Sequence, residues 1–213
     1  MVTNILCWFQ GRAQHTIAAI IAISPLVLFF GWGLIIQLDV DLPPGRGLEL
    51  VELLSYSLLA TASHSPMKWL EKQSPRKLLG YRMFGLALRT LFIMASVISL
   101  GLVLIYFPAN TVPFGEVFGL DEQSLSLAYF IQVGIGVLIV SYIAELLSLI
   151  SFVGTLPFLT IATYIGLIYI RPIFHFVFPQ SLDFASIWQV SVCGMLAGAV
   201  AITGHLRSQS RLS

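Results

Sequence analysis

The sequence is poor in charge. Only 10% of its 213 residues are Asp, Glu, Lys or Arg, whereas 57% are hydrophobic. A soluble domain has roughly a quarter charged residues, because its surface must face water. So few charges cannot cover the surface of a soluble protein of this size. We therefore expect the outer surface to be apolar and the protein to be integral to a lipid bilayer.

The sequence also has almost no net charge, only two cysteines and no histidine in the interior of an apolar segment. The formal net charge is +1, so the protein lacks the strong positive electrostatic potential that attracts nucleic acid, and we expect no nucleic-acid partner. Cys7 precedes the first apolar segment and Cys193 lies in the last one, so a disulfide between them is not expected, and no metal-ligand spacing exists. A haem-binding bundle needs paired histidines inside the membrane. The four histidines lie at or beyond the ends of apolar segments, so we expect no cofactor: His15, His64, His175 and His205.

Motifs of known catalytic sites are missing as well. The chain has no His-Glu-x-x-His, no Gly-x-Ser-x-Gly and no glycine-rich phosphate loop. An intramembrane enzyme needs an acid pair or a serine–histidine couple at membrane depth. Glu145 has no second acid beside it in its apolar segment, and no histidine lies at the depth of the serines. We therefore predict no catalytic residues, no metal site and no enzymatic activity.

Long apolar runs are abundant. A helix needs about 20 apolar residues to cross a hydrocarbon layer about 30 Å thick. Helices are expected because backbone groups in lipid must bond within their own segment. Pro25 is expected to kink the first run. The sequence predicts an all-α, polytopic membrane protein that forms one domain over residues 1–213, a multi-pass bundle of about six transmembrane helices: 16–36, 48–63, 83–107, 125–147, 156–174 and 184–203.

The second segment, 48–63, allows two interpretations. Its clean apolar part is short, and Glu49 and Glu52 occupy its first turns. It is either a short span whose acids reach outward to the interface, or a re-entrant or interfacial helix. In the second case five spans remain and the N-terminus moves outside.

Basic residues gather in one loop, 64–82. Because cytoplasmic loops collect Lys and Arg, we expect this loop and both chain termini to be cytoplasmic. Short tails and compact loops favour a bacterial inner membrane. The loop either determines topology alone, contacts anionic lipid headgroups or docks a protein partner. Its basic residues are Lys68, Lys72, Arg76, Lys77 and Arg82.

Two ionisable residues lie inside apolar segments. Arg89 is about two turns into the third segment, and Glu145 is near the inner end of the fourth. Charges within the membrane are costly, so each is a functional candidate. Because the two helices run in opposite directions, Arg89 and Glu145 fall at similar depth. They either form an ion pair that fixes helix packing or reach the inner interface separately.

Small and polar residues form two further patterns. Gly134, Ser141, Glu145 and Ser148 share one helical face, which either packs against a neighbouring helix or lines a proton or cation path. Gly194-x-x-x-Gly198 predicts a close-packing seam, either within the bundle or between protomers.

The first hypothesis is a non-catalytic membrane subunit that acts as a scaffold, assembly or interaction protein. It would pack with lipid and with a protein partner or a second copy of itself. The alternative is a small oligomeric ion or solute permease or channel, with Glu145 and its stripe facing water. A dry environment around Glu145 favours the first hypothesis, and a water-filled cavity favours the second.

Overall fold

The computed structural model describes seven stretches of the chain. Within them it contains six helices and one two-residue strand pairing. The described residues are 14–32, 35–36, 45–63, 75–106, 127–148, 156–170 and 187–210. The helices are α2 (Gln14–Gly31), α3 (Gly47–Ser63), α5 (Pro75–Tyr106), α6 (Leu127–Ser148), α7 (Leu156–Ile170) and α8 (Ile187–Ser210).

The expectation of an all-α fold is confirmed, and each predicted segment corresponds to one helix. The predicted end of the first helix, at residue 36, is wrong, because α2 ends at Gly31 and Ile35 and Ile36 form strand β1 (Ile35–Ile36). This strand pairs antiparallel with β2 (Gly45–Arg46), Ile35 opposite Arg46. Helix α2 ends earlier, where the amide of Trp32 donates to the carbonyl of Leu28 at 2.9 Å. Glycines follow at this point and favour a turn.

The boundary of the basic loop also needs correction. Helix α5 begins at Pro75, so the last eight residues of the predicted loop, 75–82, are helical and include Arg76, Lys77 and Arg82. Proline suits the first position of a helix, and Lys, Arg and Leu are good helix formers. A boundary placed where the apolar run begins therefore misses the polar first turns. Lys68 and Lys72 lie outside the described residues.

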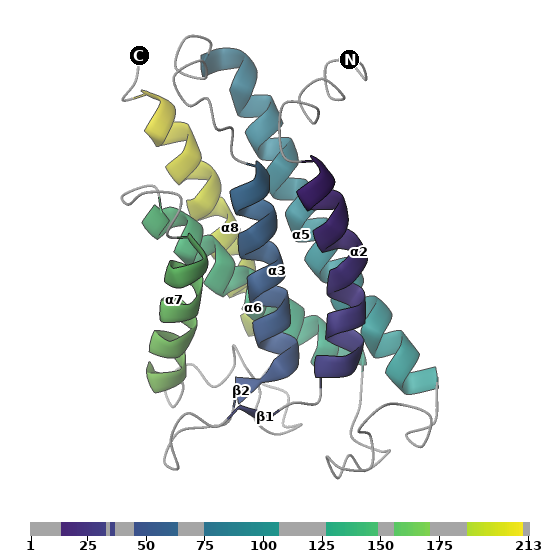
Figure 1. Ribbon diagram of the computed structural model, residues 1–213. Coiled ribbons are helices and arrows are strands. Elements are labelled where there is room, and N and C mark those ends of the chain that lie inside the picture. The colour runs from purple at the N-terminus through teal and green to yellow at the C-terminus, as the bar shows by residue number, and fades with distance from the viewer. Residues whose placement is uncertain are drawn as a thin grey trace.

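The helices run alternately toward opposite ends of the bundle, so that the start of α2 and the end of α8 lie at the same end (Figure 1). Helix α3 is central and packs against α2, α5, α6 and α7. Helix α8 packs mainly against α6 and leaves its other side uncovered. Strand β1 pairs with β2, which directly precedes α3, so the segment that follows α2 is held beside the start of α3. The central position of α3 decides which side chains meet in the interior.

The outer surface of the bundle is rich in large apolar side chains. Leu91 on α5 is 68% exposed, Phe158 on α7 is 73% exposed and Trp188 on α8 is 72% exposed. Helix α2 presents a further row of apolar residues: Ile21, Ile23, Leu26, Val27 and Phe30. Monomeric soluble proteins rarely expose apolar surface of this extent.

Two helices are long and apolar enough to cross a membrane by length and composition, over Met83–Tyr106 and Leu127–Ser148. Three other described helices have shorter apolar stretches: Thr16–Gly31, Leu156–Leu167 and Trp188–Gly204. The six-span topology and the sidedness of the termini remain predictions.

Candidate functional site

One face of α3 carries three polar side chains. Glu49, Glu52 and Tyr56 follow one another at spacings of three and four residues, which places them on the same side of a helix. All three are buried. Of the two interpretations of this segment, the one in which the acids reach outward does not agree with this burial. Because α3 is enclosed by four other helices, its polar face turns inward and meets hydroxyl groups on its neighbours.

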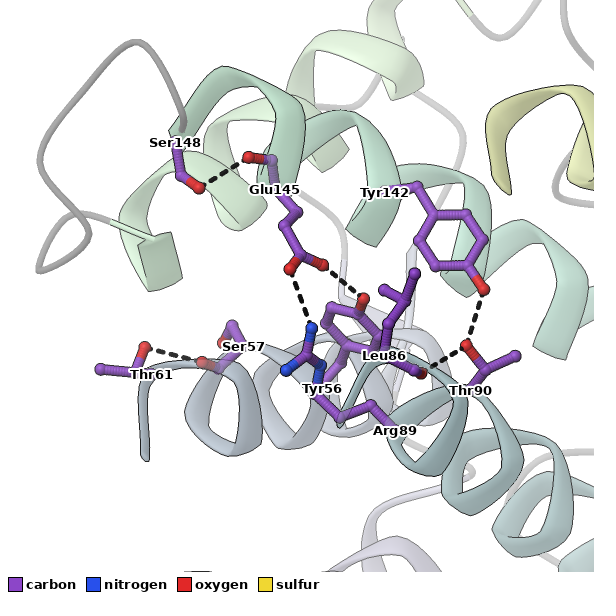
Figure 2. Close-up of polar contacts among 9 residues, drawn as sticks. All are labelled: Tyr56, Ser57, Thr61, Leu86, Arg89, Thr90, Tyr142, Glu145 and Ser148. Carbon is purple, nitrogen blue, oxygen red and sulfur yellow. Dashed lines mark hydrogen bonds and ion pairs between the residues drawn. The ribbon is translucent and has the colours of Figure 1, made fainter. Parts of the chain in front are cut away.

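Arg89 and Glu145 meet in the interior of the bundle. Arg89 Nη2 lies 2.8 Å from Glu145 Oε1, and the Tyr56 hydroxyl donates to Glu145 Oε2 at 2.7 Å (Figure 2). Both oxygens of the carboxylate are thus bonded. The Arg89 guanidinium also lies over the Tyr56 ring, 5.3 Å from its centroid, a favourable cation–π arrangement. The polar groups of Arg89, Glu145 and Tyr56 therefore bond one another inside the bundle.

A second contact joins α5 and α6 beside this group. The Thr90 hydroxyl donates to the Leu86 carbonyl at 2.9 Å and lies 2.7 Å from the Tyr142 hydroxyl (Figure 2). A hydroxyl has one hydrogen, so Tyr142 is the donor to Thr90. The rings of Tyr56 and Tyr142 stand edge to face, 6.3 Å apart. We call Tyr56, Arg89, Thr90, Tyr142 and Glu145 the central cluster.

The two buried acids of α3 each bond a neighbouring helix. The Tyr164 hydroxyl on α7 donates to Glu49 Oε2. Ser96 on α5 has its hydroxyl oxygen 2.6 Å from Glu52 Oε1. Together with the bond from Tyr56 to α6, these contacts connect α3 to three helices through polar side chains. In a lipid environment such bonds hold helices together, because water does not compete for them.

The predicted stripe on α6 faces the interior. A Cβ at Gly134 would lie 3.1 Å from Met94 Sδ, so α5 approaches closely there. Ser148 donates to the backbone carbonyl of Glu145 at 2.6 Å. Ser141 is buried, and its hydroxyl has no hydrogen-bond partner among the residues that the structure describes. The stripe is thus a buried helix-packing face in the described part of the chain.

The predicted glycine seam on α8 also faces α6. A Cβ at Gly194 would lie 2.8 Å from Ile135 Cγ2, and one at Gly198 would lie 3.5 Å from Tyr142 Cε2. Of the two alternatives for this seam, the structure places it within the bundle. The outward side of α8 presents large apolar residues instead: Trp188, Met195, Leu196, Val200, Ile202 and Leu206.

Metal-binding groups are not found in the described stretches, where no three His, Cys, Asp or Glu side chains come together. Cys193 is a free thiol on α8 and is half-buried. Cys7 and the histidines 64 and 175 lie outside the described residues.

Sequence reasoning missed the hydroxyl partners of the acids. The spacing of Glu49, Glu52 and Tyr56 was a partial signal, because it places three polar residues on one helix face, but spacing alone does not show whether that face turns inward. Ser96 and Tyr164 carried no comparable signal, since isolated hydroxyls are common in apolar helices. No protein-family model, curated protein or solved structure matches this chain.

Proposed function

We propose that this protein is a multi-pass membrane subunit without a catalytic site, which acts as a scaffold, assembly or interaction protein in the inner membrane of a bacterium. The observation that carries the proposal is the closed central cluster, in which Arg89 and Tyr56 occupy both carboxylate oxygens of Glu145.

The distribution of polarity supports the membrane placement. Large apolar side chains face outward on α2, α5, α7 and α8, whereas an arginine and three glutamates are buried: Arg89, Glu49, Glu52 and Glu145. Polar residues in membrane bundles face the interior and pair with one another, because lipid offers them no partner. The apolar lengths of α5 and α6 also agree with a bilayer. Shorter helices can be accommodated by local thinning of the bilayer.

The surroundings of Glu145 favour a scaffold over a transport path at this position. Its side chain is buried, both of its oxygens are bonded, and Tyr142 and Thr90 pack beside it. A conducting site must exchange its ligand with water, and a carboxylate whose oxygens already have two strong partners is poorly suited to that. The central cluster is better suited to holding α3, α5 and α6 in one arrangement.

A small oligomeric permease or channel for ions or solutes is the second candidate, and one observation favours it. Glu52 is a buried acid that has no ion pair in the described part of the chain. Acids of this kind inside membrane bundles often mark ion or proton pathways. If the protein is a permease, the acid that would take part in transport is therefore Glu52, and not Glu145 as the sequence pattern suggested.

The test of the scaffold role is affinity purification of the tagged, full-length protein in mild detergent, followed by mass spectrometry. We expect one partner at a fixed ratio. An unrelated multi-pass protein with the same tag is the control. Purification without any partner, together with ion or solute flux through vesicles that contain the pure protein, would support the permease and overturn the scaffold.

Sidedness is tested by cysteine labelling. Single cysteines are placed at Lys72 and at Glu122 in a chain that carries Cys7→Ser and Cys193→Ser. An impermeant maleimide applied to intact cells is expected to label position 122 and not position 72, and to do the opposite in inside-out vesicles. Labelling of both positions from one side would contradict the proposed topology.

A protein that stays monodisperse in buffer without any amphiphile would contradict the membrane placement itself.

A further inference from the structure

Glu52 differs from Glu145, whose two carboxylate oxygens are both bonded. Its side chain is 2% exposed, and its Oε1 has the Ser96 hydroxyl as a hydrogen-bond partner at 2.6 Å. Oε2 is buried and has no hydrogen-bond partner in the described part of the chain. Taking an ionised carboxylate out of water without a counter-charge is very costly, so such a group takes up a proton instead.

The hydroxyl of Ser96 supplies a second argument. Its oxygen lies 2.6 Å from Glu52 Oε1 and also 2.9 Å from the backbone carbonyl oxygen of Ile93. A carbonyl oxygen only accepts, and a serine hydroxyl has one hydrogen to donate. Both contacts are full hydrogen bonds only when Ser96 donates to Ile93 and a protonated Glu52 donates to Ser96. The geometry therefore fits the neutral carboxylic acid better than the carboxylate.

None of the charged and titratable groups described around Glu52 is placed to neutralise a negative charge on its carboxylate. Arg89, the one cation among the described side chains of α5, is engaged by Glu145 and lies about two turns from Ser96 along the helix. The described side chains of α2, residues 16–31, include no charged group. The other buried titratable groups on α3, α6 and α7 in the described part of the chain are acids or phenols: Glu49, Tyr56, Tyr129, Tyr142, Glu145 and Tyr164.

We propose that Glu52 is a proton-binding site in the interior of the bundle, with Ser96 as its hydrogen-bond partner. The ligand is a proton, which the carboxyl group takes up and releases reversibly. Glu145 does not share this property, because Arg89 holds it as a carboxylate. The site goes beyond a scaffold role and relies on the proposed membrane placement only for its dry surroundings.

The site is tested with dicyclohexylcarbodiimide, an apolar reagent for protonated carboxyl groups in apolar surroundings. The acid gives its proton to one nitrogen of the reagent while its oxygen adds to the central carbon, and the acyl group then migrates to nitrogen. No other reactant is needed. Purified protein in detergent is treated across a pH series and digested, and modified peptides are identified by mass spectrometry. We expect modification at Glu52 that decreases as the pH rises and is lost in Glu52→Gln.

Glu49→Gln is the matched control, since it changes the neighbouring acid on the same helix face and is expected to leave the label on Glu52. Glutamine has nearly the shape of a protonated glutamic acid, so Glu52→Gln is expected to fold. Gel filtration in detergent and circular dichroism check this directly. A second measurement does not depend on access of the reagent. The infrared carbonyl band of a protonated carboxylic acid is expected in the wild type at neutral pH and is expected to be lost in Glu52→Gln.

Loss of the infrared band in Glu52→Gln supports the site even where the reagent does not react. Modification confined to Glu49 or Glu145, or an infrared spectrum that Glu52→Gln leaves unchanged, overturns it. These outcomes are independent of the search for a partner protein. A stoichiometric partner and a protonated Glu52 can both be found, and either can fail without the other.

Discussion

Arg89 and Glu145 are 56 residues apart in the chain, and their side chains lie 2.8 Å from each other inside the bundle. The contact arises because α5 and α6 run in opposite directions and pack together. Tyr56 on α3 bonds the remaining carboxylate oxygen, so three helices meet at one carboxylate. A buried ion pair adds little net stability by itself, but the loss of one partner leaves an uncompensated charge.

Single substitutions of this pair are expected to be costly, and the double substitution less costly than their sum. Arg89→Ala and Glu145→Ala should each lower the free energy of unfolding by about 3–5 kcal/mol, because each leaves a buried charge unpaired. Unfolding in mixed micelles of mild detergent and dodecyl sulfate measures these changes. Additive losses in the double variant would show that the two side chains are not coupled.

Removal of the Tyr56 hydroxyl tests the third member of the group. Tyr56→Phe keeps the ring against Arg89 but removes the donor to Glu145 Oε2. The same unfolding measurement should show a loss of about 1.5–3 kcal/mol, the usual range for a hydrogen bond to a charged group. Tyr106→Phe is the matched control, because Tyr106 is 80% exposed at the end of α5. An equal effect of the two substitutions would argue against a role for the Tyr56 hydroxyl.

The two glycines of the α8 seam should respond differently to alanine. Gly194→Ala places a methyl group 2.8 Å from Ile135 Cγ2, an overlap that requires the Ile135 side chain or the packed helices to shift. We expect a loss of about 1–3 kcal/mol, typical of overpacking. Gly198→Ala makes an ordinary contact at 3.5 Å with Tyr142 and should be neutral or slightly stabilising. The reverse order would mean that α8 packs on α6 in another register.

Leu91 distinguishes lipid from water as the outer solvent. Its side chain points out of the bundle from the apolar part of α5. In a bilayer, Leu91→Arg should cost about 2.5–3.5 kcal/mol and lower the amount of protein in washed membranes. In water, the same exposed substitution should change stability by no more than about 0.5 kcal/mol. Leu91→Ile is the apolar control and should insert like the wild type.

Much of the helical framework was predictable from the sequence, because apolar runs bounded by proline and glycine define helices locally. The six runs correspond to α2, α3, α5, α6, α7 and α8. The polar start of α5 was not predictable from hydropathy, since Arg76, Lys77 and Arg82 are compatible with both a loop and a helix. The ion pair between Arg89 and Glu145 was one of two alternatives from the sequence, because the two residues lie at similar depth in helices that run in opposite directions. The observed contact agrees with that alternative.

The sequence by itself determined that this chain forms apolar helices and that a small number of ionisable groups must lie among them. Both follow from composition and from the order of residues along each helix. Only the tertiary structure decided that the acids of α3 face inward, that Gly194 contacts α6, and that Glu145 has a counter-charge while Glu52 has none in the described part of the chain. The physical reason is that the rotation of a helix about its own axis depends on its neighbours. Residue spacing along one helix does not specify which helix will lie beside each face.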